Sequence, residues 1–181
     1  MKMHPEQIIL LLINVIGGVL VIGSYVWGIK TNPQGVNALW GGVPSQTRGL
    51  YFASMILAAI SYFLFTFFIL FKLNPAEVKI ANVFSFGLFQ IIYILILLPS
   101  ALWMPLGLVM LENPKTIIWW SIRLVLIIVA LASLALLLSL LFLSPKQSGA
   151  FYWLAVAGIT IFFLHTAILD ALLWPLYFNA K

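Results

Sequence analysis

The sequence predicts an all-α integral membrane protein, folded as a single bundle of five transmembrane helices. The chain of 181 residues is 64% hydrophobic and only 7% charged, and its mean hydropathy is +1.17. Its apolar residues fall into five long runs, each able to cross a hydrocarbon core of ~30 Å. Helices are required because backbone polar groups inside a membrane must be hydrogen-bonded within the protein, and runs of this length are too long for barrel strands.

The predicted spans cover residues 8–29, 49–71, 80–105, 116–143 and 150–176. The first run is too long for the apolar region of a signal peptide and lacks an A-x-A cleavage site, so we expect a retained span. Asn-Pro follows the second run, Asn-Pro precedes the fourth, and a Ser-Pro-Lys-Gln-Ser-Gly segment separates the last two. Only the first connection, residues 30–48, is long.

The third span is irregular because it carries two prolines, Pro99 and Pro105, near its predicted end. Proline interrupts the backbone hydrogen-bond ladder of a helix. We therefore predict that this helix is kinked, or ends, between the two prolines. An opened backbone that lines a cavity is the less favoured alternative.

Five spans place the termini on opposite sides of the membrane and make the molecule asymmetric. Six tryptophans fall on the C-terminal side, namely Trp27, Trp40, Trp103, Trp119, Trp120 and Trp174, whereas only Trp153 falls on the N-terminal side. Aromatic belts ordinarily decorate both interfaces. Basic residues are balanced between the sides, four against four, so the positive-inside rule leaves the orientation undetermined.

Three titratable residues lie inside the predicted spans: Arg123, His165 and Asp170. Arg123 and Asp170 lie on consecutive spans at equal distances from the connection that joins them, which gives them the same depth. A lone charge at depth costs at least ~2.5 kcal/mol, so we predict an intramembrane ion pair between these two residues. His165 is expected to bond to a hydroxyl such as that of Tyr93 or Ser133.

Several classes of chemistry find no support in the sequence. The net charge of +5 would favour nucleic acid in a soluble protein, but the basic residues stand singly at the ends of apolar runs, which indicates membrane anchoring and no nucleic acid. Catalytic motifs are absent, and there is no Cys for thiolate metal sites. We therefore predict no catalytic residues and no metal site, and the sequence identifies no cofactor.

The five spans, the chain length, the Trp content and the long first connection resemble the topology of the tryptophan-rich sensory protein/translocator family. The stretch from Gly49 to Met55 resembles the start of that family's second helix. Elsewhere the sequence departs from the family: the Tyr-to-Met spacing differs by one residue, and the loop lacks the Lys-Pro-x-Trp core. The third and fifth spans also lack the family's Trp and Asn pattern. The resemblance concerns topology and transfers no functional residue.

These observations predict a non-enzymatic bundle that binds an apolar or amphipathic ligand, such as a lipid, sterol, quinone or tetrapyrrole, in a Trp-rich cavity on the C-terminal side. Its predicted lining comprises Trp27, Trp40, Trp103, Trp119 or Trp120, Trp174 and His165, with Arg123 and Asp170 at its floor. The alternative is an accessory subunit of a larger membrane complex, whose partners are the bilayer and other membrane subunits. A small transporter, or an isomerase that uses His165 and Asp170 as acid and base, is less favoured.

Overall fold

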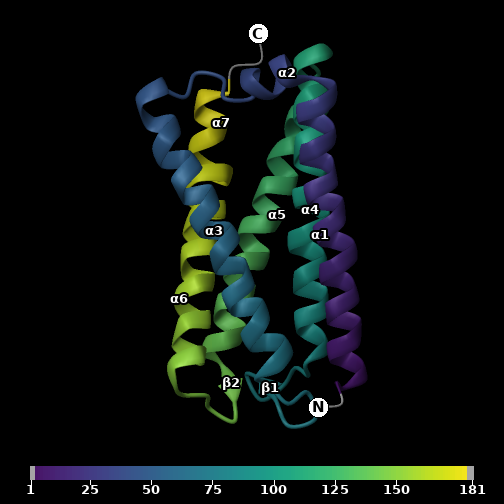
Figure 1. Ribbon diagram of the computed structural model, residues 1–181, viewed down its shortest axis with the longest axis vertical. Coiled ribbons are helices and arrows are strands. Elements are labelled where there is room, and N and C mark those ends of the chain that lie inside the picture. The colour runs from purple at the N-terminus through teal and green to yellow at the C-terminus, as the bar shows by residue number, and fades with distance from the viewer. Residues whose placement is uncertain (1–2, 179–181) are drawn as a thin grey trace.

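The computed structural model describes residues 3–178, and within this range five helices are long and apolar enough to cross a membrane. They are α1 (Pro5–Thr31), α3 (Ser45–Phe71), α4 (Gly87–Glu112), α5 (Thr116–Leu141) and a last helix (Ala150–Tyr177). The last helix comprises α6 (Ala150–Leu164), the π-helix η1 (His165–Leu173) and α7 (Trp174–Tyr177). The helices form an elongated bundle with its termini at opposite ends (Figure 1). The protein is an integral, multi-pass membrane protein, as the sequence predicts.

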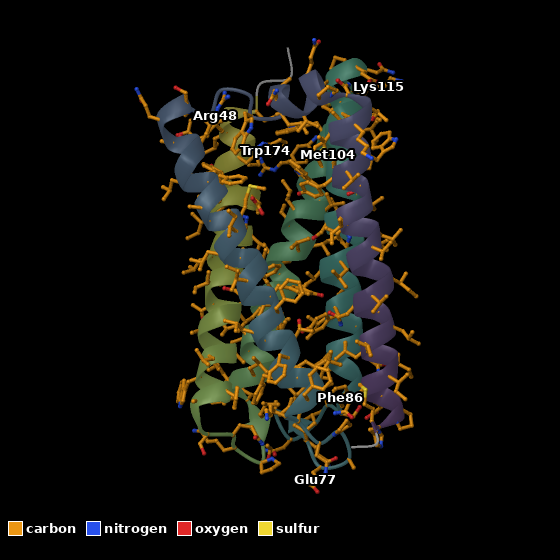
Figure 2. The ribbon with its side chains drawn as sticks, in the orientation of Figure 1. Arg48, Glu77, Phe86, Met104, Lys115 and Trp174 are labelled. Atoms are coloured by element: carbon orange, nitrogen blue, oxygen red, sulfur yellow. The ribbon has the colours of Figure 1, made fainter. Side chains whose placement is uncertain are left out.

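The outer surface of the bundle is apolar along its length, whereas charged residues gather at its ends. Ile16, Phe63 and Leu131 are each at least 60% exposed, which in a membrane means contact with lipid chains. Arg48 and Lys115 lie at the C-terminal end of the bundle and Glu77 lies at the opposite end (Figure 2). This distribution fits a bilayer with headgroups at both ends.

The helices are arranged as two pairs, α1 with α4 and α3 with α6, and α5 contacts both α4 and α6. Gly17 lets α1 approach α4 closely, because a Cβ atom there would lie 2.7 Å from Leu97 Cδ1. Gly158 does the same for α6 and α3, since its Cβ would lie 3.1 Å from the carbonyl oxygen of Ser61. Small residues therefore fix the backbone spacing within each pair.

Helices α1 and α3 meet near the N-terminal side and diverge toward the C-terminal side (Figure 1). The amide of Gln7 donates to the carbonyl oxygen of Leu70 at 2.7 Å, and Tyr62 Oη donates to Asn14 Oδ1 at 2.6 Å. Both bonds lie in the N-terminal half of the bundle. The divergence beyond them leaves room between the helices in the C-terminal half.

A layer of aromatic side chains closes the middle of the bundle, and we call Tyr62, Phe65, Tyr93 and Phe162 the aromatic layer. Phe65 and Tyr93 are completely buried, and the Phe65 ring lies 5.3 Å from Tyr62 and 5.6 Å from Phe162 between centroids. Tyr93 Oη is hydrogen-bonded to Thr66 Oγ1 at 2.8 Å. The layer is therefore tightly packed, with the hydroxyls of both its tyrosines hydrogen-bonded.

The third helix does not begin where hydropathy suggests. The predicted span starts at Ile80, but Ile80 belongs to the short strand β1 (Lys79–Ile80), which pairs antiparallel with β2 (Leu143–Ser144). The next two residues, Ala81 and Asn82, have positive φ angles of 51° and 59°, which no α-helix accommodates. The helix consequently begins only at Gly87. Apolar residues in the turn extend the hydrophobic run and conceal this boundary.

The predicted end of the third helix is also wrong. Pro99 and Pro105 both lie inside α4, which continues to Glu112. Proline is tolerated at such positions in membrane helices because neighbouring groups can satisfy the freed backbone carbonyls. An end between the prolines is therefore excluded, while a bend at these residues stays a prediction. The long first connection contains a short helix, α2 (Pro33–Ala38).

Candidate functional site

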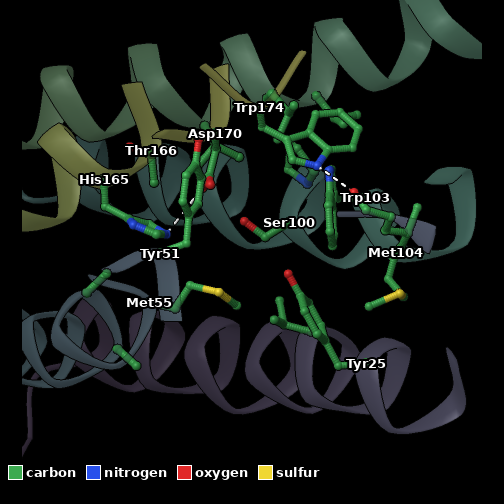
Figure 3. Close-up of a pocket in the computed structure, with 18 of the residues that line it drawn as sticks. Tyr25, Tyr51, Met55, Ser100, Trp103, Met104, His165, Thr166, Asp170 and Trp174 are labelled. Atoms are coloured by element: carbon green, nitrogen blue, oxygen red, sulfur yellow. Dashed lines mark hydrogen bonds and ion pairs between the residues drawn. The ribbon is translucent and has the colours of Figure 1, made fainter. Parts of the chain in front are cut away.

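A cavity of about 550 Å³ lies in the C-terminal half of the bundle. Every long helix contributes to it, and α2 and the residues after it cover its end. Most of its lining is apolar or aromatic. Its polar or hydrogen-bonding lining residues include Tyr25 of α1, Tyr51 of α3, Ser100 and Trp103 of α4, and His165, Thr166, Asp170 and Trp174 of the last helix. Figure 3 shows several of these side chains directed toward a common space.

The cavity is open on the side where α1 and α3 diverge. Ile29 on α1 and Phe52 and Met55 on α3 all line it, and these side chains are 54%, 58% and 38% exposed. Residues that face both the cavity and the outer surface mark an opening. Because that surface contacts lipid chains, the opening gives the cavity access from within the bilayer.

The π-helix η1 brings the principal polar groups of the cavity together. His165 and Asp170 are five residues apart, a separation that places side chains on different faces of an α-helix. A π-helix bonds residue i to residue i+5 and therefore aligns residues at this spacing. Consequently His165 Nε2 and Asp170 Oδ2 lie 3.5 Å apart. On the other side of the ring, Nδ1 is hydrogen-bonded to Ser54 Oγ of α3 at 2.9 Å.

The two members of this pair differ in how they meet the cavity. The side chain of His165 is 8% exposed, whereas that of Asp170 is 36% exposed. Asp170 lies within a membrane span and lines the cavity, so its exposed surface faces the cavity interior. The carboxylate is thus the more accessible member of the pair, and His165 is the more deeply buried one.

Two hydrogen-bond donors that line the cavity have no partner within the described residues. Tyr51 Oη and Trp103 Nε1 are both buried and unpaired, and Tyr51 as a whole is 8% exposed. A buried donor without a partner costs about 1–3 kcal/mol. By contrast, Trp174 Nε1 donates to the carbonyl oxygen of Leu39 at 2.9 Å. Tyr51 Oη and Trp103 Nε1 both have almost no accessible surface, so they lie inside the cavity wall, and an acceptor in the cavity reaches them only if these side chains turn.

Aromatic rings form much of the wall around these groups. The Trp103 ring lies 5.7 Å from Trp174 in a T-shaped arrangement and 5.9 Å from Tyr25 in a stacked one. Trp40 meets Tyr51 edge to face at 6.1 Å. These rings come from four helices and from the segment after α2, and their mutual contacts give the cavity wall a defined shape.

The structure separates the six predicted tryptophans into two groups. Trp40, Trp103 and Trp174 line the cavity. Trp27 and Trp120 are 49% and 61% exposed and are not among the lining residues. Trp119 is also outside the lining, where its ring stacks on Phe178 at 5.7 Å. The prediction that Trp27, Trp119 and Trp120 line the cavity is thus wrong. The depth of a residue in the membrane does not determine whether its side chain points into the bundle or away from it.

The predicted Arg123–Asp170 ion pair is wrong: it is not found among the ion pairs of residues 3–178. The guanidinium of Arg123 lies 5.9 Å from the centroid of the Trp119 ring, one turn away on the same helix, and its Nε has no hydrogen-bond partner among the described residues. The prediction used only the equal depth of Arg123 and Asp170 in the membrane. In the structure, the π-helix η1 directs the Asp170 side chain toward the cavity and His165. The prediction that Arg123 lies at the floor of the cavity is also wrong, because Arg123 is not a lining residue. Phe162 of the aromatic layer does line the cavity.

The predicted partners of His165 are also corrected. Tyr93 bonds to Thr66, and Ser133 Oγ bonds to Thr166 at 3.0 Å. The contributions of Ser54, Tyr25 and Tyr51 are not apparent from the sequence, since α1 and α3 carry several other Ser, Thr, Asn and Tyr residues.

Ser54, His165 and Asp170 form a line of hydroxyl, imidazole and carboxylate groups. In a hydrolase, such a line activates the hydroxyl as a nucleophile. Here Ser54 is not among the residues that line the cavity, so its hydroxyl does not meet an occupant. Its contact with Nδ1 instead orients the imidazole, which leaves Nε2 directed at the carboxylate. The arrangement is therefore suited to binding and not to nucleophilic attack.

The described residues contain no group of three or more His, Asp or Glu side chains that could hold a metal ion. Comparisons with protein-family models, with curated proteins and with solved structures give no match to this chain. The interpretation of the site therefore depends on its own geometry.

Proposed function

We propose that this protein binds an amphipathic ligand, which enters the cavity from the bilayer between α1 and α3. The observation that carries the proposal is the combination of an apolar, bilayer-facing opening with polar groups that converge inside. Ligand sites in proteins are mostly apolar concavities of roughly 300–1,000 Å³ with a few placed polar groups. The cavity of about 550 Å³ falls within that range.

The polar groups indicate where the head of the ligand lies. Asp170 presents acceptor oxygens, while the unpaired donors of Tyr51 and Trp103 are buried in the cavity wall. A ligand with a donor would satisfy the carboxylate, and an acceptor beside it would satisfy the wall donors once these side chains turn toward it. Its apolar part would then extend along Val21, Ile29 and the other apolar lining residues toward the opening.

The environment of His165 ranks the candidate ligands. Both ring nitrogens are engaged, Nδ1 with Ser54 and Nε2 with Asp170. An axial bond from His165 to a tetrapyrrole metal would require one of these contacts to break. The geometry therefore favours lipids, sterols and quinones over tetrapyrroles.

The test is a binding titration of the purified protein in lipid nanodiscs. Tryptophan fluorescence is recorded while cholesterol, a short-chain ubiquinone or protoporphyrin IX is added, and native mass spectrometry counts the bound molecules. We expect saturable quenching by at least one sterol or quinone. The Trp103→Phe variant should show weaker binding and a smaller signal, whereas Trp120→Phe, which alters an exposed ring outside the cavity, should bind normally.

Absence of saturable binding by sterols, quinones and organic cations alike would contradict the proposal. A native mass that shows the chain only together with other protein subunits, and without a small molecule, would instead favour the accessory-subunit hypothesis.

A further inference from the structure

The cavity has an unusual charge balance for a site inside a membrane. Among its lining residues, Asp170 is the single carboxylate, and there is no Lys or Arg. The nearest expected counter-charge, Arg123, lies over Trp119 and outside the lining. An ionised carboxylate at this depth is costly unless an opposite charge meets it. The side chains that line the cavity therefore supply no positive charge to balance the Asp170 carboxylate.

His165 does not remove this deficit in its neutral form. His165 Nδ1 is hydrogen-bonded to Ser54 Oγ, and Nε2 lies 3.5 Å from Asp170 Oδ2. This contact orients the carboxylate but adds no positive charge. The Asp170 side chain is 36% exposed and lines the cavity. Tyr25 and Tyr51, from α1 and α3, also line this space and contribute no positive charge.

The aromatic lining is also suited to a cation. Trp and Tyr rings attract ammonium groups through their negative faces, and clusters of such rings recognise alkylated ammonium. Tyr25, Tyr51, Trp103 and Trp174 line the same space as Asp170, and Figure 3 shows Tyr51 beside Asp170 with Tyr25 directed into the cavity. Trp40 is excluded from this group because the Arg48 guanidinium already lies 5.7 Å from its ring centroid.

We infer that the ligand is an amphiphile with an organic cation as its head, such as an alkylated ammonium, bound between the Asp170 carboxylate and the rings of Tyr25, Tyr51, Trp103 and Trp174. This inference rests on the proposed function and specifies the ligand class for the same cavity. The apolar tail leaves through the opening between α1 and α3.

The test compares two probes of nearly equal size and opposite charge, tetraphenylphosphonium and tetraphenylborate. Binding of each radiolabelled ion to the full chain in maltoside micelles is measured by equilibrium dialysis, and the uptake of protein-free micelles is subtracted. We expect saturable binding of tetraphenylphosphonium and none of tetraphenylborate. The Asp170→Asn variant should weaken cation binding by roughly tenfold or more, as expected for the loss of a charge-assisted contact.

The matched control is Glu112→Gln, which removes one negative charge from the same side of the membrane but outside the cavity. It should leave the affinity for tetraphenylphosphonium within about twofold, because an exposed charge is screened. If Asp170→Asn does not fold, judged by its elution profile and thermal transition, Tyr25→Leu serves as the second variant. It should weaken cation binding while it leaves the carboxylate in place.

The outcomes distinguish the two proposals. Equal binding of both ions, or unchanged cation binding by the Asp170→Asn and Tyr25→Leu variants, would overturn the cationic head group. Saturable binding of cholesterol or ubiquinone in the same preparation would then leave the proposed function intact. No saturable binding by any ion, sterol or quinone would overturn both.

Discussion

At the scale of single residues, the site depends on three polar side chains that are held in register by neighbouring helices. Ser54 on α3 fixes the orientation of the His165 ring, and the ring in turn contacts Asp170. Hydrogen bonds of this kind between membrane helices contribute about 0.6 kcal/mol on average and at most about 2 kcal/mol. Their main effect here is to direct the carboxylate into the cavity.

A pair of double-mutant cycles tests which partner Asp170 has. His165→Ala and Asp170→Ala should be coupled, with an interaction free energy of about 0.5–3 kcal/mol, because the two groups are in contact. Arg123→Ala and Asp170→Ala should be additive within about 0.5 kcal/mol, since the structure does not join them. Free energies of unfolding in mixed micelles supply the measurement. Strong coupling to Arg123, or none to His165, would refute the observed pairing.

The residues of the site were only partly predictable from the sequence. His165 and Asp170 could be found because titratable groups are rare in membrane spans. Their contact could not be predicted, since α-helical periodicity places residues five apart on different faces. Tyr25 and Tyr51 gave no comparable signal because tyrosine is also common at membrane interfaces.

At the scale of the elements, glycine positions determine how closely the paired helices approach. Gly17 and Gly18 are neighbours on α1 and differ in their surroundings. A Cβ at Gly17 would meet Leu97 Cδ1 at 2.7 Å and Leu97 Cβ at 2.8 Å, whereas a Cβ at Gly18 would have nothing within 4 Å. The two positions thus form a natural matched pair for testing the packing of α1 against α4.

We expect Gly17→Ala to destabilise the protein by about 1–3 kcal/mol, because the added methyl group forces α1 and α4 apart. Gly18→Ala should change stability by no more than about 0.5 kcal/mol, as its methyl group points to open space. Reversible unfolding in mixed micelles measures both. Equal effects of the two substitutions would show that the α1–α4 spacing differs from the one described.

The existence of the helices followed from hydropathy, but their local irregularities did not. The predicted span of residues 80–105 begins before the helix does, because Val83 and Phe84 continue the apolar run through a turn. Asn82 tolerates the left-handed conformation of that turn, and a single Asn is a weak sequence signal. Likewise, no composition marks η1, since a π-helix differs from an α-helix in its hydrogen bonds and not in its hydropathy.

At the scale of the whole molecule, the divergence of α1 and α3 determines access to the cavity. Ala59 on α3 lines the cavity at this opening, whereas its neighbour Ile60 is 54% exposed and lies outside the lining. The two positions are adjacent on one helix but face different surroundings. A bulky side chain at the first should obstruct the opening, and the same side chain at the second should point into lipid.

We expect Ala59→Trp to abolish or strongly slow the saturable binding of any cavity ligand, and Ile60→Trp to leave it unchanged. Stopped-flow measurement of tetraphenylphosphonium uptake by protein in micelles gives the rate, and equilibrium dialysis gives the affinity. Unchanged binding by Ala59→Trp would show that ligands enter elsewhere, for example past α2 on the C-terminal side.

The aromatic layer has a consequence for traffic through the bundle. Phe162 belongs both to that layer and to the cavity lining, and Phe65 and Tyr93 beside it are fully buried. The layer therefore forms the inner end of the cavity. A ligand that enters as proposed would meet these rings and would leave by the opening between α1 and α3 through which it came. Passage toward the opposite leaflet would require several packed rings to separate at once.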